Sequence, residues 1–82
     1  GYPACPDHSE KAKLWKLLNV SENINVDLTE SFAMNPPSSV CGYYFTREEA
    51  DYFMVGKVDK DQVEDYARRK QISLEEAERW LR

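Results

Sequence analysis

Three side chains in this sequence have the chemistry of soft metal ligands. Cys5 and His8 are separated by two residues, and Cys41 follows much later in the chain. A closed structural zinc site needs four such ligands, and sequences usually supply them as two closely spaced pairs. One pair and a single further cysteine do not meet this requirement, so we expect no metal site. Two buried thiols and a histidine at the start of a helix are the favoured interpretation.

A catalytic centre is equally hard to assemble from these residues. The sequence has one histidine, and no serine or cysteine stands at a recognised spacing from a histidine and a carboxylate. The acidic side chains fall on helical faces, where ion pairing or solvation accounts for them. The basic run Arg68-Arg69-Lys70 ends an expected helix and complements the helix dipole. We therefore expect no catalytic residue in this chain.

Aromatic side chains are the more informative group. Tyr52 and Phe53 lie on one expected strand, so their side chains point to opposite faces. Tyr43, Tyr44 and Phe45 lie on the neighbouring expected strand, which favours aromatic pairs across the two strands. The pattern alone indicates a sheet covered on one side by helices, with phenol groups reaching water at its edge.

The elements that position these residues begin with an irregular segment. In the opening GYPACPDH, Pro3 and Pro6 favour extended conformations at the residues that precede them, Tyr2 and Cys5. A helix is predicted over His8–Leu18, because Asp7 and Glu10 have capping-box spacing and an apolar stripe follows. One further helical turn is expected over residues 21–24. The alternation in DLTESFAM, residues 27–34, then predicts a strand.

The second half of the chain predicts two more strands and two helices. Two stretches are rich in aromatic and β-branched residues and predict strands: VCGYYF, residues 40–45, and ADYFMVGKV, residues 50–58. The residues between them, Thr46–Ala50, suit a hairpin connection. Capping-box spacings at Asp59 and Ser73 mark two helix starts. We therefore predict an α+β fold with an N-terminal helix, a three-stranded antiparallel sheet and two C-terminal helices, in a partial domain without an internal linker.

Composition limits the classes of partner. The net charge is −4 and the isoelectric point is near 4.9, which argues against binding to nucleic acid or to an anionic membrane. No apolar run approaches the ~20 residues of a membrane-spanning helix. Two cysteines do not make a disulfide framework, so a reducing, cytoplasmic location is expected.

Several longer stretches resemble one family. The chain resembles the C-terminal activation domain of cobalamin-dependent methionine synthase along all 82 residues. The stretches that carry the resemblance are GYPACPDHSEK, LTESFAM, CGYYF, KDQVEDYARRKQIS and EEAERWL. The resemblance implies that residues 1–82 are the C-terminal portion of that domain. It also implies a fragment of a methyltransferase that catalyses nothing by itself.

The resemblance carries an expected role in methionine biosynthesis. In that family the domain binds S-adenosylmethionine and docks over the cobalamin-binding domain of the same polypeptide after the cobalt has oxidised to Co(II). S-adenosylmethionine then supplies a methyl group, a flavodoxin-type partner supplies an electron, and methylcobalamin is regenerated. Cobalamin itself is held by another domain.

The same resemblance implies the ligand-binding residues. GYPACP, which includes Tyr2, is expected to be the second half of an extended segment that lies along S-adenosylmethionine. The phenol of Tyr52 is expected to reach the ligand, and Phe53 to contribute backbone groups. The family's ligand-binding arginine and an acidic residue precede the stretch that matches Gly1, so residues 1–82 are expected to hold about half of the site.

A second hypothesis stays open from the residues alone. A small α+β domain with an acidic surface suits a protein-interaction module that has no small-molecule ligand. The two hypotheses are compatible, since the family domain also meets protein partners.

Overall fold

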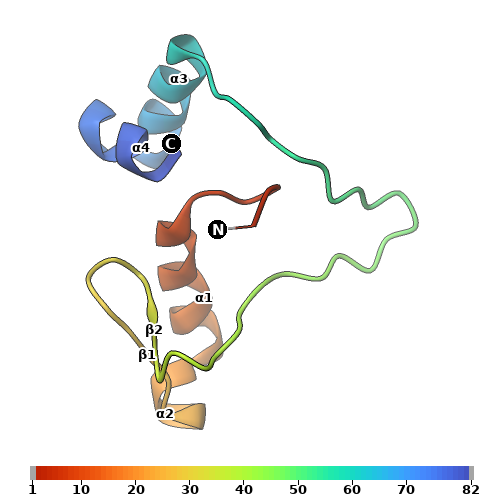
Figure 1. Cartoon of the computed structure of the whole chain (residues 1–82), viewed down its shortest axis with the longest axis vertical. Helices are drawn as coiled ribbons and strands as arrows, with labels where there is room; N and C mark the ends of the chain where they lie inside the picture. The colour runs from red at the N-terminus through yellow and green to blue at the C-terminus, as the bar shows by residue number, and fades with distance from the viewer. Residues whose placement is uncertain (1, 82) are drawn as a thin grey trace. The chain divides into compact units, whose positions relative to one another are not determined.

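A computed structural model describes residues 2–81. The chain divides into two compact units, one made of residues 8–50 and the other of the residues up to Asp7 together with those from Asp51 onward. The elements, in chain order, are the 3-10 turn η1 (His8–Glu10), the helices α1 (Lys11–Leu18) and α2 (Val20–Ile24), the strands β1 (Asp27–Leu28) and β2 (Met34–Asn35), and the helices α3 (Lys60–Lys70) and α4 (Leu74–Leu81) (Figure 1). The α+β class is thus confirmed.

The first predicted helix is confirmed as η1 followed directly by α1. It ends at Asn19, which has a φ of 50° and donates its backbone N–H to the carbonyls of Trp15 and Lys16. Asparagine is one of the few side chains that tolerate this left-handed conformation, so it can close a helix where glycine is absent. The expected further turn is α2, and the Trp15 indole donates to the Val26 carbonyl at 2.8 Å just after that turn.

The continuous strand predicted over residues 27–34 is wrong. β1 and β2 are two short antiparallel strands, with Leu28 opposite Met34, and the chain reverses between them. Thr29 causes the reversal: its carbonyl accepts from Phe32 at 2.9 Å and its hydroxyl accepts from the Ala33 N–H at 3.1 Å. Threonine hydroxyls can compete in this way with the hydrogen bonds of regular strand pairing. The alternating sequence pattern gives no sign of this competition.

The other two predicted strands are also wrong in the described part of the chain. Residues 36–59 contain no helix or strand, so the expected hairpin is absent (Figure 1). A turn is present where its connection was expected, with the Ala50 N–H 3.1 Å from the Arg47 carbonyl. Strand propensity reflects how side chains pack on a sheet, and a ladder also needs a neighbouring strand. Here Tyr44 is 94% exposed and Met54 is 75% exposed, so the packing that favours a strand is absent. In place of the predicted three-stranded sheet, the described residues form one two-stranded antiparallel ladder, β1 with β2.

Both predicted C-terminal helices are confirmed, together with their caps. The Asp59 N–H donates to the Gln62 side chain at 2.8 Å in a capping box, and Ser73 accepts from the Glu76 N–H at 3.1 Å. The two helices enclose a small core. Its buried members are Val63, Ala67 and Ala77, and the partly buried side chains packed against it are Val58, Tyr66, Ile72 and Leu81.

Candidate ligand-binding site

The N-terminal segment forms a tight turn. The Cys5 N–H donates to the Tyr2 carbonyl at 2.8 Å, and the two residues form an isolated antiparallel bridge. Pro3 occupies the second position of this turn, where its fixed φ is favourable. The expectation of a segment that is extended throughout is therefore wrong at Pro3 and Ala4.

A backbone hydrogen bond joins this turn to the segment that precedes α3. The Val55 N–H donates to the Pro3 carbonyl at 3.1 Å, and both residues belong to the same compact unit. Val55 lies two residues after Phe53, so the structure brings together the two segments that carry Tyr2, Tyr52 and Phe53. Each of these three aromatic side chains is 57% exposed, so none of them is filling the core.

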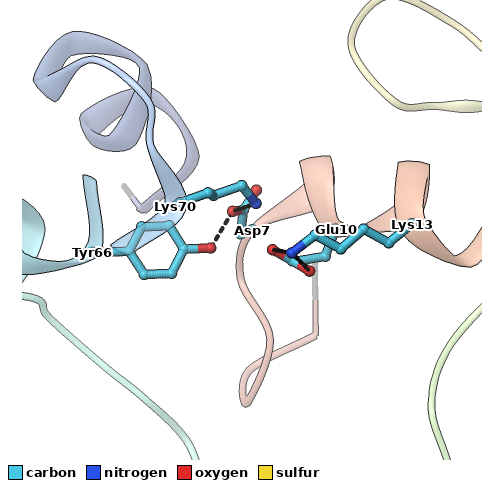
Figure 2. A network of polar contacts seen from close by, with 5 residues as sticks. All are labelled: Asp7, Glu10, Lys13, Tyr66 and Lys70. Carbon is cyan, nitrogen blue, oxygen red and sulfur yellow. Dashed lines mark hydrogen bonds and ion pairs between the residues drawn. The ribbon is translucent and has the colours of Figure 1, made fainter. Parts of the chain in front are cut away.

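Asp7 fixes the end of the N-terminal segment to α3. The Tyr66 hydroxyl and the Lys70 ammonium both donate to the Asp7 carboxylate, the latter at 2.7 Å (Figure 2). Asp7 is only 4% exposed, and the Lys70 side chain is 16% exposed, so this ion pair is largely withdrawn from water. The Lys70 nitrogen also lies 5.6 Å from the centre of the Tyr66 ring, within the range of a cation–π contact.

The sequence alone does not predict this cluster. It indicates Asp7 only as a helix cap and Lys70 only as a complement to the helix dipole. Tyr66 and Lys70 are four residues apart, which places both side chains on one face of α3. That spacing was visible in the sequence, but nothing local links it to a carboxylate at the other end of the chain.

Burial and the Asp7 carboxylate together set the protonation of Tyr66. Burial raises the pKa of Tyr66 to about 12, helped by the hydrogen bond to Asp7 and by its negative charge, while Lys70 acts in the opposite direction. The phenol therefore stays protonated at neutral pH. In that form Tyr66 is a hydrogen-bond donor to Asp7.

The remaining chemical candidates have ordinary environments. Cys5 and Cys41 are thiols, and both are partly exposed, so the prediction that they are buried is wrong. Across residues 2–81, no three His, Cys, Asp or Glu side chains are close enough to hold a metal ion. His8 lies in η1 with its Nδ1 3.0 Å from the Lys11 ammonium, which also donates to the Phe32 carbonyl at 2.9 Å.

Two other observations bear on the site. A shallow pocket in the unit of residues 8–50 includes none of the three candidate aromatics; it is lined by His8, Lys11, Ser31, Phe32, Ala33, Met34 and Pro37. Among the described helices, none has the length and apolar character that crossing a membrane requires.

Comparison with known proteins identifies the family of this chain. A family model described as "Vitamin B12 dependent methionine synthase, activation domain" matches residues 1–71. A crystal structure of the MetH reactivation domain bound to AdoHcy is 56% identical in sequence, with a TM-score of 0.93 over 99% of this chain. The chain covers 25% of the length of that solved chain. Because the family model matches most of the sequence, and the solved structure nearly all of it, the chain belongs to the activation-domain family of vitamin B12 dependent methionine synthases.

Proposed function

We propose that residues 1–82 are the C-terminal portion of an activation domain that binds S-adenosylmethionine for reductive remethylation of Co(II) cobalamin in methionine biosynthesis. The observation that carries this proposal is the Pro3–Val55 hydrogen bond of 3.1 Å, because it joins the two segments assigned to the ligand. The similarity to a reactivation domain bound to AdoHcy supports it. AdoHcy is S-adenosylmethionine without its transferable methyl group, so a site that accepts it suits a methyl donor.

The residues of this chain bind and orient the ligand. S-adenosylmethionine carries a sulfonium cation, which is attracted to the faces of exposed aromatic rings such as Tyr2 and Tyr52. The Tyr52 hydroxyl supplies a hydrogen bond, and the backbone of Phe53 and of residues 2–6 supplies further polar groups. Binding of this kind needs no general base, because the methyl acceptor is the cobalt of a cobalamin held by another domain. Residues 1–82 alone therefore catalyse no reaction.

The proposed partners are the cobalamin-binding domain of the same polypeptide and a flavodoxin-type reductant, in the cytoplasm. Exposed apolar side chains in residues 40–45 support the need for a covering surface: Val40 is 85% exposed and Phe45 is 63% exposed. Clustered apolar exposure of this kind usually marks a contact surface. The same observation favours the second hypothesis, a protein-interaction module without a small ligand.

Calorimetry with S-adenosylmethionine separates the two hypotheses. We expect the complete activation domain that contains this sequence to bind the ligand in the micromolar range. Residues 1–82 alone should bind far more weakly, because the charged groups expected on the ligand's carboxylate and amine lie outside them. Losing one charge-assisted contact costs about 1.5–3 kcal/mol, enough to move a micromolar site toward millimolar. Absence of binding by the complete domain would overturn the proposal and leave the interaction module.

A further inference from the structure

We propose that Asp7, Tyr66 and Lys70 form a positioning cluster that holds the N-terminal segment, residues 2–7, in its ligand-binding conformation. The inference rests on the proposed function and gives a positioning role within it to three residues to which no ligand contact has been assigned. All three residues lie in one compact unit, together with the segment that carries Tyr52.

The contacts of the cluster are stronger than a surface ion pair. The Asp7 carboxylate is 4% exposed and accepts from two donors, the Lys70 ammonium at 2.7 Å and the Tyr66 hydroxyl. A buried carboxylate is stable only when it is paired and hydrogen-bonded, so removing either donor takes away part of what offsets its burial. The less well compensated carboxylate would then move toward water and take its backbone with it.

The connection from Asp7 to the ligand-facing turn is short and stiff. Asp7 follows Cys5 by two residues, and Pro6 lies between them. Proline fixes its own φ and restricts the residue before it, so few backbone torsions are free between the Asp7 carboxylate and the Tyr2–Cys5 turn. At the other side of the turn, the Pro3 carbonyl is held by the Val55 N–H. The Asp7 carboxylate and the Pro3 carbonyl are thus two of the points that hold the segment, and release of Asp7 removes one of them.

The cluster can be perturbed apart from the core of the unit. Val63, Ala67 and Ala77 are the buried core residues, and the hydrogen bonds of Asp7 to Tyr66 and Lys70 involve none of them. The Tyr66 ring packs against this core, whereas its hydroxyl is the atom that meets Asp7. Replacing Tyr66 with phenylalanine keeps the ring in place and removes only the donor.

The test measures AdoHcy affinity by calorimetry in the complete activation domain that contains this sequence. If release of Asp7 leaves about one molecule in ten with the segment in place, the apparent Kd rises about tenfold. We expect this rise for Lys70→Gln and a smaller rise for Tyr66→Phe, while Lys70→Arg retains the charge and most of the affinity.

Two control variants accompany Lys70→Gln, one that also loses a positive charge and one that also loses stability. Arg69→Gln removes a positive charge from the same end of α3, but Arg69 pairs with Asp65 at 2.9 Å on the surface, so the Kd should not change. Ala77→Gly lowers the melting temperature through the core and should also leave the Kd unchanged. If Lys70→Gln changes the Kd no more than Ala77→Gly does, the positioning role is refuted. If the unmodified domain fails to bind AdoHcy, the proposed function fails instead.

Discussion

The Val55 N–H donates a hydrogen bond of 3.1 Å to the Pro3 carbonyl, which joins two segments of one compact unit through backbone atoms alone. No side chain of either residue takes part, so this contact depends on the position of the two segments rather than on residue type. Its persistence therefore reports whether the N-terminal segment is in place.

Amide hydrogen exchange measures that persistence directly. We expect the Val55 amide to exchange more slowly than the amide of Met54, a residue that is 75% exposed, because only opening of the contact to Pro3 releases the Val55 hydrogen. Asp7→Asn should accelerate exchange at Val55 in the complete domain, while amides in the centre of α4 keep their rates. Equal exchange rates at Val55 before and after the substitution would show that Asp7 does not hold the segment.

Tyr52 is expected to contribute a hydrogen bond to the ligand. Tyr52→Phe keeps the ring and removes the hydroxyl, which leaves a polar group of S-adenosylmethionine unpaired. Binding to the complete domain should weaken by about 1–3 kcal/mol, roughly ten- to hundredfold. In the full-length enzyme, reactivation should slow at limiting S-adenosylmethionine, whereas the initial rate of primary turnover should hardly change.

Tyr44 provides the matched control for this substitution. Its side chain is 94% exposed and belongs to the other compact unit, so Tyr44→Phe removes an equivalent hydroxyl from a residue with no assigned role in the site. We expect the S-adenosylmethionine affinity of the complete domain, measured by calorimetry, to stay unchanged for Tyr44→Phe. An unchanged value for Tyr52→Phe as well would remove Tyr52 from the site.

Signals that act within a few residues made much of this fold predictable. The caps at Asp59 and Ser73 each join residues three apart, and both are present as hydrogen bonds in the structure. The prediction of one strand over residues 27–34 is wrong because of an equally local interaction. The turn formed by Thr29 reverses the chain there, although the side chains alternate as in a strand. An alternation of apolar and polar residues indicates which side chains would share a face of a strand, but it does not indicate where the backbone reverses.

Contacts between distant residues could not be predicted from the sequence. The ion pair of Asp7 with Lys70 spans most of the chain, and neither residue has a local signal for the other. Strands at residues 40–45 and 50–58 likewise depend on partners that the pattern does not specify. Tyr2, Tyr52 and Phe53 became candidates only through family resemblance, and the structure adds that the Pro3–Val55 contact joins their segments.

Tyr66 is expected to make the free energy of unfolding depend on pH in the alkaline range. Burial and Asp7 raise the pKa of Tyr66 to about 12 from the ordinary value of 10.0, so the folded state holds the phenolic proton more tightly than the unfolded state does. This contribution is complete below pH 10 and is lost as the pH rises from about 10 to about 12. The free energy of unfolding, measured by urea titration, should therefore fall more steeply in that window than in Tyr66→Phe. Parallel curves for the two proteins would contradict the assignment.

Gln71 offers a stabilising substitution. It closes α3 with a φ of 60° and donates its N–H to the Ala67 and Arg68 carbonyls, a left-handed position that glycine adopts without steric cost. Gln71→Gly should raise the free energy of unfolding by about 0.5–1 kcal/mol, since relief of the left-handed strain exceeds the added entropy of the unfolded chain. Glu64→Gly, in the middle of the same helix, should lower it by about 1 kcal/mol. Thermal unfolding of both variants measures the difference, and a loss of stability in Gln71→Gly comparable to that in Glu64→Gly would show that α3 does not end at Gln71.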